Sequence, residues 1–222
     1  VIYDEKLTPT MPWSTFVAGL DFEGYPAVYL IVEAIYAPVE RGVLVNGVDV
    51  VKSGAGWTFD ADSNIATLDG TCKYVISGED HSGCGVAFHV KEGKADITFD
   101  NLRLSPGMEV GVMGRGLFQL SPGAVVTLSL KGTNTVYAAY YDDEDGQHSD
   151  IAGVYVPEGA SQAVTNAPNA GIAQLEVRGS RKGAAIGGCG GYAGQITIAG
   201  GTVVATGGFQ AQDIGSGAVT YD

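Results

Sequence analysis

Glycines that follow short apolar segments recur about every 30 residues, and this spacing constrains the fold more than any other feature. Three of them, Gly93, Gly123 and Gly159, lie 30 and then 36 residues apart, and the matching tripeptides 185–187 and 213–215 lie 28 residues apart. A period between about 20 and 50 residues indicates stacked units that share one apolar core. At the turns we expect the glycines to adopt the positive φ that other residues disfavour.

The units consist of strands, because apolar and polar residues alternate with a period of two. Four segments place apolar side chains at every second position, where we expect them to point inward: Ala95, Ile97 and Phe99; Val126, Leu128 and Leu130; Leu175 and Val177; Ile196 and Ile198. Such alternation is typical of half-buried strands. No apolar stripe at helical spacing extends over ten residues, and the ambiguous residues 25–39 are rich in the β-branched and aromatic side chains that favour strands. The sequence therefore predicts an all-β fold.

Two segments near the C-terminus carry a family resemblance. GAAIGG at residues 183–188 and GQITIAGGTVVATGG at residues 194–208 resemble the GAGIGG…GGTITIxGGTVTATGG coils of bacterial carbohydrate-binding-domain-like and cell-adhesion proteins. The resemblance extends over roughly residues 43–217. It implies a single-stranded right-handed parallel β-helix, a solenoid, over residues 43–222, on the outside of a bacterial cell. We interpret residues 1–42 as an N-terminal cap or the end of a preceding module.

The charge of the chain narrows the range of partners. Twelve Lys and Arg residues stand against 25 Asp and Glu, a net charge of −13. Such a surface repels phosphate, so we expect neither nucleic acid nor an anionic membrane as a partner. The longest apolar stretch, residues 27–39, contains Glu33 and is too short to insert into a bilayer. The chain begins at Val1 without a charged leader, which is consistent with a removed signal peptide or a shortened chain.

Cysteine and glycine motifs point to no cofactor. Three cysteines are too few for a disulfide framework; Cys72 and Cys84 are either a pair across a turn or, as we favour, small buried hydrophobes. No C-x-x-C or histidine cluster indicates zinc. Residues 188–193 fit G-x-G-x-x-A, but a strand is expected after them where a dinucleotide site needs a helix.

Enzymatic function is the main alternative, because β-helices also host pectin-degrading hydrolases and lyases. Asp142 and Asp143 are the only adjacent Asp pair, and the His, Arg and Lys companions of those enzymes do not follow them. We therefore predict no catalytic residues. His89 is interpreted as a surface residue that points outward from a strand, and His81 and His148 as solvated side chains of loops.

Residues 137–150 and 161–172 lengthen turns that are short in the related coils, and long excursions from a rigid scaffold often carry binding sites. The first excursion combines tyrosine rings, which stack on sugar faces, with carboxylates, which accept hydrogen bonds from sugar hydroxyls. The predicted ligand-binding residues are Tyr137, Tyr140, Tyr141, Asp142 and Asp143. The predicted calcium ligands are Asp142, Asp143, Asp145 and Asp150. EF-hand spacing fails because Tyr141 stands four residues before Asp145, and a solvated acidic loop is the alternative.

These observations favour a non-catalytic, secreted or cell-surface module that binds a glycan or a surface protein and mediates adhesion. The alternatives are a polysaccharide-degrading enzyme and a structural stalk. Residues 211–217 begin another coil, and a bare coil end presents unpaired backbone, so we expect that the chain continues with further coils or a capping segment, or that it self-associates through this end.

Overall fold

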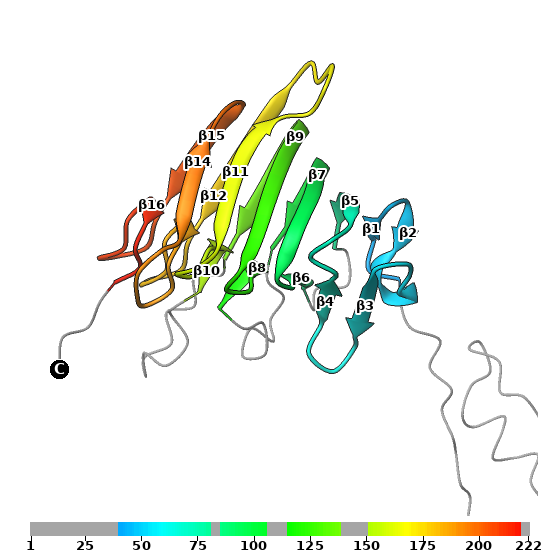
Figure 1. Cartoon of the computed structure of the whole chain (residues 1–222), viewed down its shortest axis with the longest axis horizontal. Coiled ribbons are helices and arrows are strands. Elements are labelled where there is room, and N and C mark those ends of the chain that lie inside the picture. The colour runs from blue at the N-terminus through cyan, green and yellow to red at the C-terminus, as the bar shows by residue number, and fades with distance from the viewer. Residues whose placement is uncertain (1–39, 81–84, 106–114, 139–150, 219–222) are drawn as a thin grey trace, which may run out of the picture. The chain divides into compact units, whose positions relative to one another are not determined.

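The computed structural model describes residues 40–80, 85–105, 115–138 and 151–218, which fall in one compact unit (Figure 1). Within them the fold is all-β, as expected, and the helical residues are those of one 3-10 turn, η1 (Val50–Lys52). None of the described helical residues form a segment long and apolar enough to span a membrane. The strand expected within residues 25–39 and nearly all of the cap expected over 1–42 lie outside the described residues.

Two sheets contain the strands. The seven-stranded sheet consists of β3 (Trp57–Asp60), β4 (Ile65–Leu68), β6 (Ala87–Val90), β8 (Gly116–Leu120), β10 (Ala152–Tyr155), β13 (Ile186–Gly187) and β16 (Ile214–Gly215), in that spatial order. The nine-stranded sheet consists of β1 (Val43–Val45), β2 (Val48–Asp49), β5 (Lys73–Glu79), β7 (Gly93–Leu104), β9 (Ala124–Tyr137), β11 (Ser161–Asn166), β12 (Ala173–Arg178), β14 (Gln195–Ile198) and β15 (Thr202–Thr206).

From β4 onward the chain passes back and forth between the two sheets, and successive strands within each sheet pair in parallel. Phe88, Phe118, Val154, Ile186 and Ile214 occupy equivalent positions in successive strands of the seven-stranded sheet. The 28-residue spacing seen in the sequence is therefore the register of β13 on β16. At the N-terminal end the pairing is antiparallel: β1 pairs with β2 and β5, and β3 pairs with β4.

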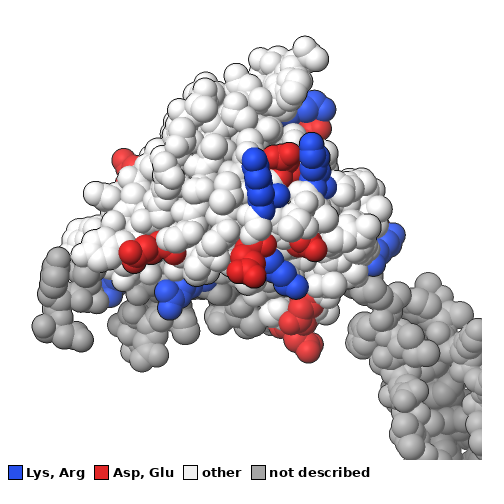
Figure 2. All heavy atoms as spheres, in the orientation of Figure 1, with Lys and Arg blue, Asp and Glu red and all other residues white. Residues whose placement is uncertain are grey.

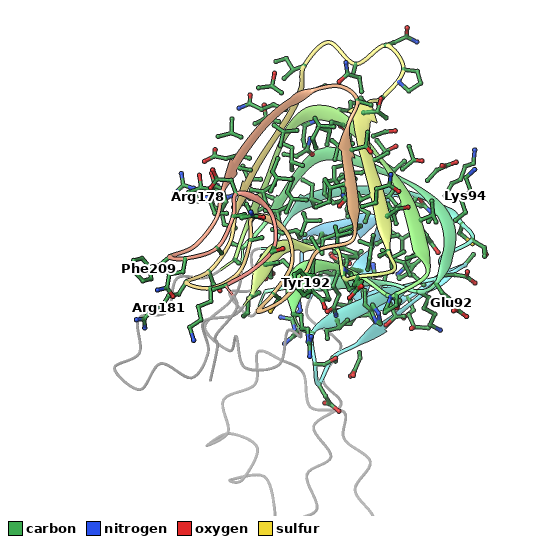
Figure 3. All side chains as sticks on the ribbon, turned by 60° about the vertical axis from the view of Figure 1, so that its left-hand side comes forward. Glu92, Lys94, Arg178, Arg181, Tyr192 and Phe209 are labelled. Carbon is green, nitrogen blue, oxygen red and sulfur yellow. The ribbon has the colours of Figure 1, made fainter. Side chains whose placement is uncertain are left out.

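The two sheets face each other across one apolar core (Figure 3). Phe99 of the nine-stranded sheet meets Phe118 of the seven-stranded sheet edge to face, with ring centroids 5.1 Å apart. The inward positions predicted in β7, β9 and β12 are all buried, which confirms that prediction. Ile196 is half-buried against the core, but Ile198 is 41% exposed, so the prediction of its burial was wrong. No described strand pairs with β14 on its outer side, and Ile198 is therefore uncovered.

Turn glycines stack from one unit to the next. Gly93, Gly123 and Gly159 have φ of 126°, 83° and 84°, which confirms the expected positive φ. The Gly93 N–H donates to the Gly123 carbonyl at 3.4 Å, and the Gly123 N–H donates to the Gly159 carbonyl at 3.0 Å. The turns therefore lie directly above one another.

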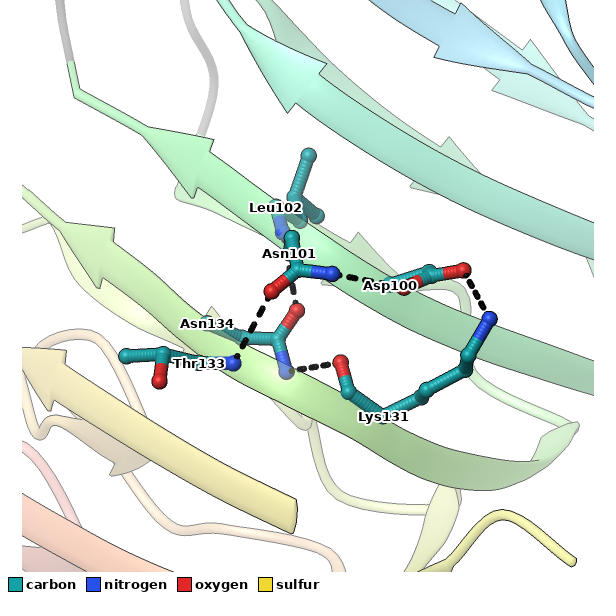
Figure 4. Close-up of polar contacts among 6 residues, drawn as sticks. All are labelled: Asp100, Asn101, Leu102, Lys131, Thr133 and Asn134. Atoms are coloured by element: carbon teal, nitrogen blue, oxygen red, sulfur yellow. Dashed lines mark hydrogen bonds and ion pairs between the residues drawn. The ribbon is translucent and has the colours of Figure 1, made fainter. Parts of the chain in front are cut away.

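The long strands β7 and β9 bend in the middle, where an asparagine holds the backbone (Figure 4). Asn134 is fully buried, and its Oδ1 accepts a hydrogen bond from the Leu102 N–H at 2.9 Å. Its Nδ2 donates to the carbonyls of Lys131 at 3.2 Å and Gln174 at 3.1 Å. The neighbouring Asn101 has φ 52°. The first half of β9 pairs with β11 and the second half pairs with β12. Beyond β9 the nine-stranded sheet therefore continues as two separate rows of strands, one on each side of the bend.

The prediction that residues 161–172 form an excursion was wrong for its first half. Ser161–Asn166 is strand β11, paired in parallel with β9 and β14. The segment connecting β11 to β12 is limited to residues 167–172. The strand was missed because Gln162, a polar residue, takes one of its inward positions.

Candidate functional site

Tyr137 is the member of the predicted ligand site that the structure describes. It is the last residue of β9, half-buried, and lies just before residues 139–150, which are outside the described part of the chain. Outside it lie the other predicted site residues, Tyr140, Tyr141, Asp142, Asp143, Asp145 and Asp150. The calcium site therefore stays a prediction.

Two charged residues of β12 join Tyr137 in a compact group, which we call the Tyr137 cluster: Tyr137, Glu176 and Arg178. Arg178 is the parallel-sheet partner of Tyr137, and its guanidinium carbon lies 4.8 Å from the centroid of the tyrosine ring. This distance is within the range of a cation–π interaction. Arg178 Nη2 also lies 2.8 Å from Glu176 Oε1, which forms an ion pair on the same face.

Hydrogen bonds within the Tyr137 cluster fix its protonation. The pKa of Glu176 is lowered, chiefly by the hydrogen bond from Tyr137 and then by that from Arg178. The pKa of Tyr137 is raised by burial and by its hydrogen bond to Glu176, and the pKa of Arg178 is raised by its bond to Glu176. At neutral pH the cluster therefore presents a carboxylate, a phenol and a guanidinium side by side on one outward face.

Further polar residues extend this face on both sides. Thr135, two residues before Tyr137, pairs with Arg103 of β7 and with Glu176 of β12. Arg103 Nη1 lies 3.3 Å from Glu79 Oε1. On the opposite side the exposed hydroxyls of β15, at Thr202 and Thr206, are in register with Gln174 and Arg178. The cluster is thus bordered by charged side chains and exposed hydroxyls on paired strands, whereas the Thr135 hydroxyl oxygen is itself buried and has no hydrogen-bond partner among the described residues.

Glu176 and Arg178 were absent from the predicted site. The alternation of residues 174–178 places both on the outward face, but their contact with Tyr137 depends on the register of β12 on β9, which joins residues 41 positions apart. No signal in the sequence gives that register.

The remaining candidate residues lie elsewhere. Cys72 is a free thiol that packs against the core, as a small hydrophobe would, and Cys84 lies outside the described residues. His89, which we predicted to be a surface residue, is half-buried in β6, with Nε2 2.8 Å from Ser121 Oγ. Burial and the nearby Lys91 lower its pKa. His81 and His148 are outside the described part of the chain.

No cofactor site is apparent in the described ranges. The segment 188–193 leads into strand β14, whereas a dinucleotide site needs a helix there. Among the described residues, no three His, Cys, Asp or Glu side chains gather closely enough to hold a metal ion. Comparison with protein families, curated proteins and solved structures gives no match for this chain.

Proposed function

We propose that this chain is a non-catalytic module of right-handed parallel β-helix that binds a glycan outside a bacterial cell and mediates adhesion. The helical path is supported by three observations: strands that pass between two sheets in turn, parallel pairing within each sheet, and turn glycines bonded one above another. The cell-surface location rests on the resemblance of residues 183–208 to the coils of such proteins.

The observation that carries the binding proposal is the register of Tyr137 on Arg178, at the point where the chain enters the predicted ligand excursion. A sugar offers apolar ring faces and many hydroxyls. The Tyr137 cluster offers an aromatic ring, a carboxylate acceptor and a guanidinium donor, and each is held by the others. Binding sites commonly combine apolar surface with a few fixed polar groups in this way.

A glycan array probed with the whole chain tests this proposal, followed by isothermal titration calorimetry with the glycans that bind. Tyr137→Ala is expected to weaken binding at least about tenfold, which corresponds to about 1.4 kcal/mol. Tyr192→Ala is the matched control, because Tyr192 is 72% exposed and is not part of the cluster. Equal loss with both variants, or no loss with Tyr137→Ala, contradicts a site at the cluster.

The purified chain also allows the two alternative functions, a polysaccharide-degrading enzyme and a structural stalk, to be distinguished. Release of reducing ends or unsaturated sugars from a polysaccharide identifies a degrading enzyme. Absence of binding to any glycan or to surface proteins identifies a structural stalk.

A further inference from the structure

The face around the Tyr137 cluster carries as many positive charges as negative ones. Arg178 and Glu176 form one ion pair, with Nη2 and Oε1 2.8 Å apart. Arg103 and Glu79 form a second, with Nη1 and Oε1 3.3 Å apart, and Arg103 and Glu176 flank the same residue of β9. Two positive and two negative side chains give a net charge of zero on this face, whereas the whole chain carries −13.

The carboxylate of Glu176 stands directly beside the guanidinium that an acidic ligand would seek. It accepts hydrogen bonds from Tyr137 and Arg178, and both lower its pKa, so it is ionised at neutral pH. A carboxylate or sulfate that approached Arg178 would meet the like charge of Glu176 within one hydrogen-bond length. Like charges placed together at a binding site exclude a ligand.

Sugar hydroxyls meet no such penalty, because a hydroxyl both donates and accepts hydrogen bonds. An ionised carboxylate can accept about four hydrogen bonds, so Glu176 has capacity for a hydroxyl of the ligand. A hydroxyl on the neighbouring ring carbon can accept from Arg178. The 2.8 Å between Nη2 and Oε1 is close to the spacing of oxygens on neighbouring ring carbons, and the side chains of Arg178 and Glu176 are 57% and 28% exposed. The pair therefore suits two adjacent hydroxyls.

Strand β15 extends this face without adding charge. Its outward side chains are Thr202, Val204 and Thr206, all of them exposed, and Thr206 is in register with Arg178. They point away from the core, so a further strand paired beside β15 would leave them exposed. A ligand that extends from the cluster over β15 therefore meets uncharged side chains.

Other cations of the nine-stranded sheet are balanced as well. Lys73 Nζ lies 3.3 Å from Asp96 Oδ2, and Lys131 Nζ lies 2.7 Å from Asp100 Oδ2. Figure 2 shows charges of both signs over the strands near the N-terminus and a broad area without charged atoms over the strands near the C-terminus. An acidic polysaccharide, whose charges repeat along its chain, is attracted by unbalanced cations, and these ion pairs offer none.

We propose that the glycan bound at the Tyr137 cluster is uncharged, and that Glu176 excludes uronic acids and sulfated sugars from this site. This inference rests on the proposed function, because it names the class of glycan that the cluster binds. Two hydroxyls on neighbouring carbons make the contact, one with Glu176 and one with Arg178. Without the charge of Glu176, the guanidinium is free to bind a carboxylate of an acidic sugar through two parallel hydrogen bonds.

Paired oligosaccharides test this inference. Neutral oligomers of glucose, galactose and mannose are each compared with the same oligomer oxidised to the uronic acid at carbon 6, by titration calorimetry with the whole chain. The parent is expected to bind a neutral oligomer and to bind its oxidised partner at least about tenfold more weakly. Its affinity for the neutral oligomer is expected to change less than about twofold between about 50 and about 500 mM salt, because salt screens interactions between charges.

Glu176→Gln keeps the size of the side chain and removes its charge. It is expected to weaken the neutral oligomer and to strengthen the oxidised one, so that the preference narrows by at least about tenfold. Glu92→Gln is the matched control: it makes the same change in net charge, but Glu92 is exposed and lies on the opposite side of the molecule from Arg178 (Figure 3). It is expected to leave both affinities unchanged.

Circular dichroism checks that each variant keeps its strand spectrum. If Glu176→Gln does not fold, Arg178→Gln serves instead, and it is expected to weaken the neutral oligomer while the oxidised one stays excluded. A parent that prefers the oxidised oligomer, or whose neutral binding falls steeply with salt, overturns this inference and leaves the proposed function standing. So does a Glu176→Gln protein that keeps the parent's preference, or a Glu92→Gln protein that loses it. Absence of any binding on the glycan array overturns the proposed function, and this inference with it.

Discussion

Replacement of Gln162 with Met is expected to stabilise this protein. Gln162 lies in β11 with its side chain in the core, where it is 2% exposed. Neither Oε1 nor Nε2 of its amide has a hydrogen-bond partner among the described residues. Its neighbours across the sheet are Val126 of β9 and Ile196 of β14, both apolar. The amide is therefore buried beside groups that cannot satisfy it.

The expected gain follows from the cost of that burial. An amide buried without a hydrogen bond costs about 1–3 kcal/mol in proteins. Met has a similar length, and its flexible thioether adapts to irregular space, so the packing penalty of the exchange is at most about 1.5 kcal/mol. We expect Gln162→Met to raise the free energy of unfolding by about 1 kcal/mol, the middle of the range that remains when this penalty is subtracted. For a chain of this size, the melting temperature then rises by roughly 2–4 °C.

Urea denaturation followed by circular dichroism measures this change, provided that the slope of the transition stays the same in both proteins. Gln195→Met is the control, because Gln195 is exposed in β14, and it is expected to change stability by less than about 0.5 kcal/mol. A Gln162→Met protein less stable than the parent by about 1 kcal/mol or more would refute the reasoning. It would show that the amide is bonded in solution, for example to a buried water that Met cannot hold.

Three further predictions concern other parts of the chain. Asn134→Leu is expected to lower the free energy of unfolding by about 2–4 kcal/mol in the same urea assay, because it leaves the buried Leu102 N–H and two carbonyls without partners; an unchanged stability contradicts this. The pKa of His89 is lowered in the folded protein, so protonation of His89 favours the unfolded chain. The stability that neutral His89 supplies is complete above the unfolded pKa of about 6.5 and is lost as the pH falls below it. The loss of stability between about pH 7.5 and about pH 5 should be smaller in His89→Gln than in the parent, and equal losses would exclude this role. Calcium at 100 times its dissociation constant is expected to add about 2.7 kcal/mol to the free energy of unfolding, which is seen as a higher melting temperature of the parent protein. A variant with Asn in place of three aspartates is expected to show no such rise. These are Asp142, Asp143 and Asp145; an equal shift in both proteins, or none in the parent, contradicts the calcium site.

Strands could be predicted from the sequence where two independent signals agree. In β7 the alternation of Ala95, Ile97 and Phe99 follows directly on a turn glycine, and both the burial and the turn were predicted correctly. In β11 the alternation is broken because Gln162 occupies an inward position, so the strand was taken for a loop. A pattern that assigns polar residues to the outside fails at those positions where a polar side chain is buried.

Alternation also cannot tell whether a strand has a neighbour on both sides. Ile198 has the same parity as its partner Val164, yet it is 41% exposed because no described strand follows β14. The side to which a residue points is a local property of its strand, whereas its burial depends on the next layer of the structure.

Tyr137 was predicted, but the contributions of Glu176 and Arg178 to the candidate site were beyond prediction for a related reason, which is the register between β9 and β12. A slip of two residues would keep Arg178 on the outward face, so the alternation would look the same. It would, however, move the guanidinium by about 6.6 Å along the strand, which takes it from 4.8 Å to beyond the roughly 6 Å from the ring centroid at which it can act on Tyr137. One partly buried contact helps to fix the register: the Asn134 amide donates to the Gln174 carbonyl, and this bond ties β12 to β9 within three residues of Tyr137. The asparagine that shapes the bend therefore also sets the geometry of the Tyr137 cluster, and a change at Asn134 should disturb ligand binding as well as stability.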